Sequence, residues 1–177
     1  MQTFCCEKYH VMKLPKTEAG FTLIELIVVI IILSILAATA LPRFANLQTQ
    51  ARVAKLNGAL GSMKGAAALA HAACLASNPQ CTQPPTNAGT LNMEGAPITM
   101  VHTYPTADAA GIVSSAGINA GPTSTDGYTV QGGGTGPGAL LFMQVQGNDP
   151  VNCSFSYQAP SAPNQAPVFG TLVITGC

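Results

Sequence analysis

The sequence predicts an α+β fold in which one long N-terminal helix packs against an antiparallel sheet of about four strands. Two observations support this prediction. A mostly apolar run over residues 21–41 continues into a segment whose apolar residues recur at spacings of three and four, as on one face of a helix. Nearer the C-terminus, four short segments rich in β-branched and aromatic residues alternate with Gly- and Pro-rich turns.

The apolar run, residues 21–41, is the first part of the predicted helix. A helix needs about 20 apolar residues to cross a hydrocarbon core of about 30 Å, so this run is long enough to span a membrane. The residues before it carry Lys8, Lys13 and Lys16, and a basic flank favours the cytoplasmic side. The rest of the chain is therefore expected outside the cytoplasm. Glu25 lies inside the run, where an unpaired carboxylate is costly, and this position needs a physical reason.

The helix is predicted to continue past the membrane segment to about Leu75, with a kink at Pro42, because proline removes one backbone hydrogen bond without necessarily ending a helix. Its second half carries one apolar stripe, and a helix with such a stripe buries it against a domain. Asn78 and Pro79 are expected to end the helix. The stripe consists of Val53, Leu56, Leu60, Met63, Ala67, Ala70 and Cys74.

The sheet is predicted from residues 127–132, 139–146, 153–158 and 168–175. Between helix and sheet the composition shifts to Pro, Thr, Asn and Gly. There, residues 96–105 form one possible extended segment, and residues 106–118 one possible short helix capped by Thr106.

Cysteine usage points to an oxidising compartment. Cys5 and Cys6 precede the apolar run, whereas four cysteines follow it, an even number that allows three disulfide connectivities. Local spacing favours the pairs Cys74–Cys81 and Cys153–Cys177, although spacing alone does not exclude the other two connectivities.

Composition argues against nucleic-acid binding and against catalysis. Only 8% of the 177 residues are charged, and no Lys or Arg follows Lys64, so the distal part could not neutralise phosphates. The histidines show no ligand spacing, and the Gly-rich segment 132–138 lacks the lysine of a phosphate loop. Asp126 and Asp149 are too few for a calcium site. We therefore expect no enzyme, no cofactor and no metal. The histidines are His10, His71 and His102.

Two models of N-terminal processing compete. An ordinary signal peptide would be cut after the small residues Ala38–Ala40, but the run is longer than a usual signal-peptide core and contains an acid. The alternative comes from a resemblance. Gly20 followed by "FTLIELIVVIIILSILAATALPRF" resembles the N-terminus of type IV pilins and the related pseudopilins. This strict match covers residues 20–44, and weaker similarity, most to the mannose-sensitive haemagglutinin type of pilin, extends to about residue 71 and to the C-terminal cysteines.

The resemblance implies how the chain is processed and assembled. A prepilin peptidase would cut between Gly20 and Phe21, Phe21 would be N-methylated, and the apolar segment would be kept. Glu25 would then meet the terminal ammonium of a neighbouring subunit and set the register between subunits. The other explanation for Glu25 is hydration near the cytoplasmic interface. Initiation at Met12 instead of Met1 would give a more usual leader length.

The implied organisation is a leader (1–20), a membrane or filament-core segment (21–41) and a head that includes the second half of the helix (42–177). The implied function is a structural subunit of a type IV pilus used for cell adhesion. It would be held in the bacterial inner membrane until it joins an extracellular fibre. Its partners would be further copies of itself, the prepilin peptidase and the inner-membrane assembly machinery. The alternative is a pseudopilin of a type II secretion system.

Overall fold

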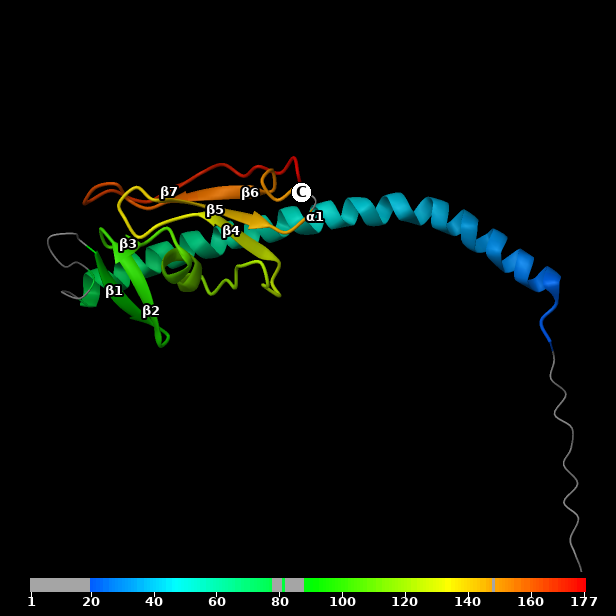
Figure 1. Ribbon diagram of the computed structural model, residues 1–177, viewed down its shortest axis with the longest axis horizontal. Coiled ribbons are helices and arrows are strands. Elements are labelled where there is room, and N and C mark those ends of the chain that lie inside the picture. Colours follow the sequence, from blue (N-terminus) through cyan, green and yellow to red (C-terminus); the bar gives the residue numbers. More distant parts are fainter. Residues whose placement is uncertain (1–19, 78–80, 82–87, 148) are drawn as a thin grey trace, which may run out of the picture. The chain divides into compact units, whose positions relative to one another are not determined.

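The computed structural model describes residues 20–77, 81, 88–147 and 149–177, so the predicted leader, apart from Gly20, lies outside the described residues. Helix α1 (Leu23–Ser77) has 55 residues and continues through Pro42 (Figure 1). The chain divides into two compact units, Met1–Arg43 and Phe44–Cys177; the second is called the head below. The helix is thus confirmed at nearly its expected length, and the kink at Pro42, next to the unit boundary, stays a prediction.

Within the head, α1 buries the stripe that its sequence predicts. Five of the seven predicted stripe residues are buried, and Val53 and Leu60 are partly buried against the main core. Ala59 and Ala66, two small side chains beside the predicted positions, are buried as well. The buried residues of α1 are Leu56, Ala59, Met63, Ala66, Ala67, Ala70 and Cys74.

The main core lies between α1 and a four-stranded antiparallel sheet of order β4-β5-β6-β7 (Figure 1). Its strands are β4 (Tyr128–Gly132), β5 (Leu140–Val145), β6 (Ser154–Gln158) and β7 (Val168–Phe169). The predicted four-stranded sheet is confirmed, although β7 is only two residues long. Alternate residues of β6 face the core, and among them Tyr157 is fully buried with its hydroxyl donating to the Pro105 carbonyl at 2.7 Å.

A second, three-stranded sheet was only partly predicted. The expected extended segment 96–105 forms a hairpin of β2 (Ala96–Val101) and β3 (Tyr104–Pro105), and β1 (Ala88–Met93) pairs with the other edge of β2. The sequence of β1, AGTLNM, has weak strand propensity. It is held by its pairing with β2, which places Leu91 opposite Ile98 in a second apolar cluster at the end of α1.

The short helix predicted over residues 106–118 is a single helical turn, η1 (Ala109–Val113), and its cap differs from the expectation. Asp108, not Thr106, is the N-cap residue: its carboxylate accepts hydrogen bonds from the Gly111 N–H at 2.7 Å and from the Thr106 hydroxyl at 2.8 Å. Asp108 lies two residues closer to the helical turn than Thr106, so its carboxylate reaches the Gly111 N–H, which has no partner within the turn. The Thr106 hydroxyl instead donates a hydrogen bond to the Asp108 carboxylate.

Candidate functional site

The start of α1 carries the residues that the sequence singles out for processing and assembly. Gly20, Phe21 and Thr22 precede the first helical residue, Leu23. The Thr22 N–H donates to Glu25 Oε2 at 2.9 Å, and the Glu25 N–H donates back to Thr22 Oγ1 at 3.3 Å. The Thr22 hydroxyl also donates to Oε2 at 3.0 Å. These reciprocal bonds are a capping box, in which each side chain satisfies a backbone N–H that the helix leaves without a partner.

The capping box gives Glu25 a role within its own chain that the sequence reasoning missed. The signal was present, because a Thr followed three residues later by Glu before an apolar run is the pattern of a capping box. One carboxylate oxygen, Oε2, is occupied by Thr22. Among the described residues no contact is found for Oε1, and no cation pairs with this carboxylate. Glu25 is therefore oriented by its own helix and keeps one oxygen available to a second chain.

The apolar segment after this site is unburied among the described residues. Its most hydrophobic window has a mean hydropathy of 2.8 and is 0% buried, so this is a helix long and apolar enough to cross a membrane. Its internal hydroxyls are already satisfied: Ser34 donates to the Ile31 carbonyl at 2.8 Å and Thr39 to the Leu36 carbonyl at 2.9 Å. The segment thus suits an environment without water.

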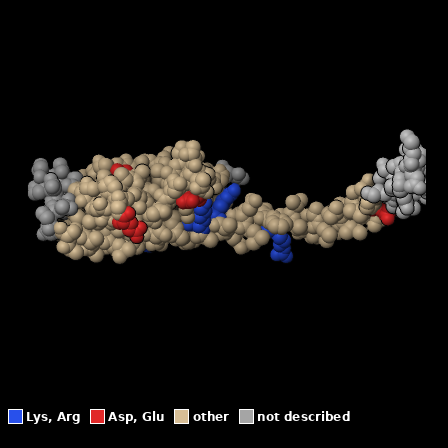
Figure 2. Space-filling view, turned by 90° about the horizontal axis from the view of Figure 1, so that it is seen from below, with Lys and Arg blue, Asp and Glu red and all other residues tan. Residues whose placement is uncertain are grey.

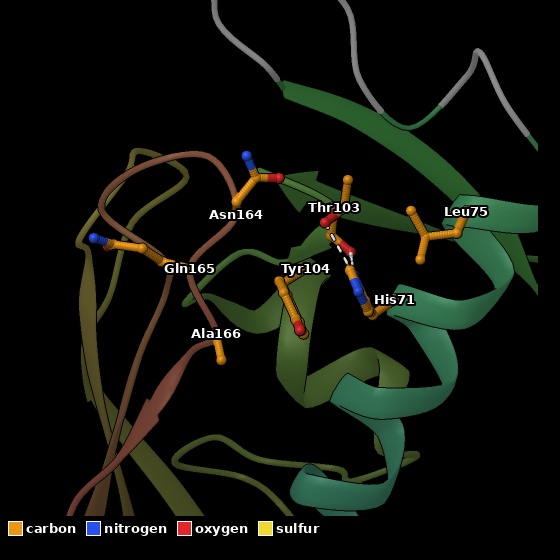
Figure 3. A pocket seen from close by; sticks show the side chains of 7 residues that line it. All are labelled: His71, Leu75, Thr103, Tyr104, Asn164, Gln165 and Ala166. Atoms are coloured by element: carbon orange, nitrogen blue, oxygen red, sulfur yellow. Dashed lines mark hydrogen bonds between the residues drawn. The ribbon is translucent and has the colours of Figure 1, made fainter.

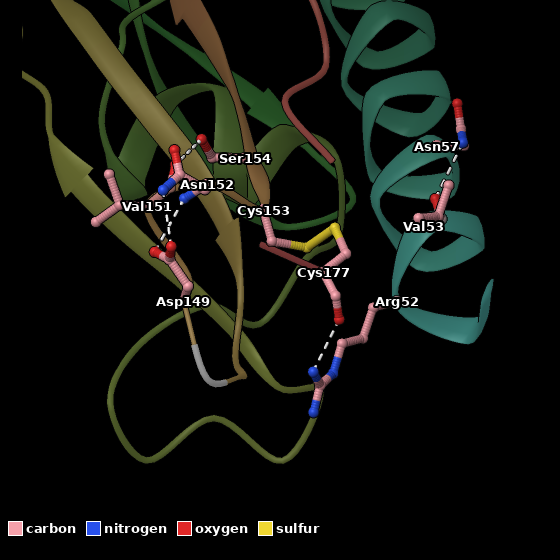
Figure 4. Close-up of a disulfide and its surroundings, with 9 residues drawn as sticks. All are labelled: Arg52, Val53, Asn57, Asp149, Val151, Asn152, Cys153, Ser154 and Cys177. Carbon is pink, nitrogen blue, oxygen red and sulfur yellow. Dashed lines mark hydrogen bonds between the residues drawn. A yellow bond between two sulfur atoms is a disulfide. The ribbon is translucent and has the colours of Figure 1, made fainter. Parts of the chain in front are cut away.

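The four distal cysteines behave differently from one another. Cys153 and Cys177 form a disulfide with Cα atoms 4.8 Å apart, and the Arg52 guanidinium of α1 donates to the Cys177 carbonyl at 2.8 Å (Figure 4). The bond predicted between Cys74 and Cys81 is not formed in this structure, which has the two as neighbouring buried thiols. They lie in the second apolar cluster, where a neutral thiol packs as a small hydrophobic group. Burial and the neighbouring Cys81 raise the pKa of the Cys74 thiol to about 12.

The remaining residues weighed in the sequence are not brought together. His71 and His102 lie in the head, and no group of three or more His, Cys, Asp or Glu suited to a metal ion occurs among the described residues. Part of the Gly-rich segment is the turn between β4 and β5. Figure 2 shows that the visible face of the head is largely uncharged, with a few acidic side chains and a small group of Lys and Arg side chains.

Comparisons with known proteins agree with these features. Residues 15–41 match the family described as "Prokaryotic N-terminal methylation motif". The chain is 47% identical over 51 residues to the type IV narrow pilus major component PilA5 of Thermus thermophilus, an alignment that covers 29% of this chain and 44% of that relative. The chain thus spans less than half of the length of this relative. No solved structure matches. In its methylation motif, and in a long helix packed on antiparallel sheets, the chain is thus similar to type IV pilins.

Proposed function

We propose that this protein is a structural subunit of a type IV pilus that contributes to cell adhesion. The observation that carries the proposal is the capping box at the start of an unburied apolar helix, within the matched methylation motif. The proposed processing is cleavage between Gly20 and Phe21 by a prepilin peptidase, followed by N-methylation of Phe21. Residues 21–41 then anchor the subunit in the inner membrane, with residues 42–177 outside, until the assembly machinery moves it into the fibre.

The capping box supports a specific assembly contact. Cleavage before Phe21 creates a terminal ammonium, and Glu25 Oε1 is the oxygen available to accept from the ammonium of a neighbouring subunit. In a filament core from which water is excluded, removing one partner of such an ion pair costs about 3–5 kcal/mol. The pair would therefore favour one register between neighbouring helices over all others.

The experiment must separate the charge of Glu25 from its capping role. Glu25→Gln keeps a side chain that can complete the capping box but removes the charge, whereas Thr22→Val removes the hydroxyl of the cap but keeps the charge. We expect fibres to be strongly reduced for Glu25→Gln and Glu25→Ala and only mildly for Thr22→Val, with export and cleavage intact in all three. Sheared-fibre yield and N-terminal sequencing measure these outcomes.

Two results would count against the proposal. A normal fibre yield in Glu25→Gln would remove the ion pair from the assembly mechanism. A mature N-terminus after Ala40 would show an ordinary signal peptide and refute the pilin function itself.

Deleting the gene distinguishes a pilin from a pseudopilin of a type II secretion system. Loss of secretion with surface fibres intact would favour the pseudopilin. The Cys153–Cys177 disulfide supports the pilin, because a disulfide-bounded C-terminal region is typical of pilins.

A further inference from the structure

A pocket opens on the head, far along the chain from the helix start. Its volume is about 400 Å³, within the range of small-molecule sites. One side is formed by His71 and Leu75 of α1, by Thr103 of the turn between β2 and β3, and by Tyr104 of β3. The other side is formed by residues 164–166, which precede β7 (Figure 3). The lining is therefore aromatic, polar and aliphatic, and it contains no Lys, Arg, Asp or Glu.

The turn that carries Thr103 is strained. His102 and Thr103 connect β2 to β3 and both have positive φ, at 48° and 72°. A two-residue hairpin turn of this kind favours Asn-Gly, and a β-branched residue at positive φ is a clear outlier. The Nδ1 atom of the buried His102 also lacks a hydrogen-bond partner in the described structure. Strain that a simpler turn would avoid is commonly retained at binding sites.

The strained turn orders the pocket wall. The Thr103 hydroxyl lies 2.9 Å from His71 Nδ1, and the Thr103 carbonyl lies 3.2 Å from the same atom. These contacts hold the imidazole parallel to the Tyr104 ring, with centroids 4.1 Å apart and planes 2° apart. Tyr104 thus lies between His71 and the loop at residues 164–166 (Figure 3). The result is a preorganised aromatic wall.

The polar groups around this wall include several that the protein does not use. In the described part of the chain, no hydrogen bond engages the Tyr104 hydroxyl, the Asn164 amide or His71 Nε2. Gln165 differs, because its side chain accepts from the Ser161 hydroxyl at 2.9 Å. Together the available groups include a donor-acceptor hydroxyl, an amide with both functions and one ring nitrogen.

We propose that this pocket binds a neutral sugar residue. A pyranose ring has an apolar C–H face that packs on an aromatic ring and a rim of hydroxyls that both donate and accept hydrogen bonds. An anionic ligand would find no Lys or Arg in the lining, and a cationic ligand would find no carboxylate. The inference names a ligand class for the proposed adhesive role, but the site belongs to the single subunit and requires no fibre.

The test uses the full-length chain in detergent and a panel of methyl glycosides of glucose, galactose, mannose and N-acetylglucosamine. Binding is measured by saturation-transfer NMR and calorimetry, with sialic acid and glucosamine as charged comparisons. We expect at least one neutral glycoside to bind, Tyr104→Ala to weaken its affinity at least tenfold, and Tyr104→Phe to weaken it less. Phe142→Ala is the matched control, because Phe142 is an aromatic residue on β5, 38% exposed and outside this pocket.

A second variant tests whether the strain serves the site. Thr103→Gly relieves the positive φ and removes the hydroxyl beside His71, so we expect a higher melting temperature and weaker sugar binding. Binding of none of the neutral glycosides, binding only of the charged sugars, or unchanged affinity in Tyr104→Ala would each overturn the proposal. Because binding is measured on unassembled protein, a chain that binds sugar but forms no fibre would refute the pilus and leave this site standing. Fibres without sugar binding would do the reverse.

Discussion

Removing the Cys153–Cys177 disulfide should destabilise the head strongly. The bond joins residues 24 positions apart, and the loop it closes contains β6 and β7. Both cysteines are buried, and the Cys177 carbonyl accepts a hydrogen bond from Arg52 of α1. Opening the bond therefore removes the covalent link that ties the end of the chain to the start of β6. The matched perturbations are Cys153→Ala with Cys177→Ala, and reduction of the unchanged protein.

The magnitude follows from the length of the loop. In the chain-entropy model, closing a loop of this length restricts the unfolded state by about 3.5 kcal/mol at 25 °C. For a domain of the size of the head, each kcal/mol shifts the melting temperature by about 3–4 °C. We therefore expect a fall of about 10–15 °C on reduction or in the double variant. Loss of the two buried side chains adds to the fall in the variant.

The assay is thermal unfolding in detergent, followed by near-UV circular dichroism of tyrosine, since the chain contains no Trp. The double variant should be insensitive to reductant. Cys74→Ala with Cys81→Ala is the control and should stay sensitive, because it keeps the Cys153–Cys177 bond and loses only two free thiols. A double variant that still responds to reductant, or a shift of less than about 3 °C, would refute the reasoning.

Two further predictions concern packing and pH. Gly111→Ala should destabilise the head severely, because a Cβ atom there would collide with backbone and side-chain atoms of Thr106. The control is Gly136→Ala, because a Cβ atom at that position meets nothing within 4 Å. Urea unfolding compares the stability of the two variants. Equal stability of these variants would contradict the close packing. The pKa of the Cys74 thiol is raised from about 9 to about 12, so the folded state favours the neutral thiol. The stability that this shift contributes should be complete below about pH 9 and lost as the pH rises towards 12. Iodoacetamide at pH 8 should therefore label Cys74 more slowly in folded than in denatured protein, as measured by mass spectrometry. Equal labelling rates would exclude a buried neutral thiol.

Local patterns predicted much of the fold. The periodicity of α1 and the β-branched and aromatic composition of β4–β6 are local features, so both could be read directly from the chain. Strand β1 could not, because AGTLNM becomes a strand only through its pairing with β2. The cap of η1 was assigned to Thr106 instead of Asp108, since either residue type can cap and only the path of the backbone selects one.

The sequence by itself determined the long apolar helix, the position of Glu25 within it and the motif that relates the chain to type IV pilins, because these depend on residue types at short spacings. The tertiary structure decided which cysteines meet and how His71 stacks on Tyr104, 33 positions later in the numbering. Spacing along the chain favoured two cysteine pairs alike, and only the packing of α1 and the two sheets decides that Cys153 and Cys177 are the bonded pair and that His71 meets Tyr104. The capping box of Glu25 depends on both: the sequence contains its residue pattern, Thr followed three residues later by Glu, and the structure shows that one carboxylate oxygen stays available for a neighbouring subunit.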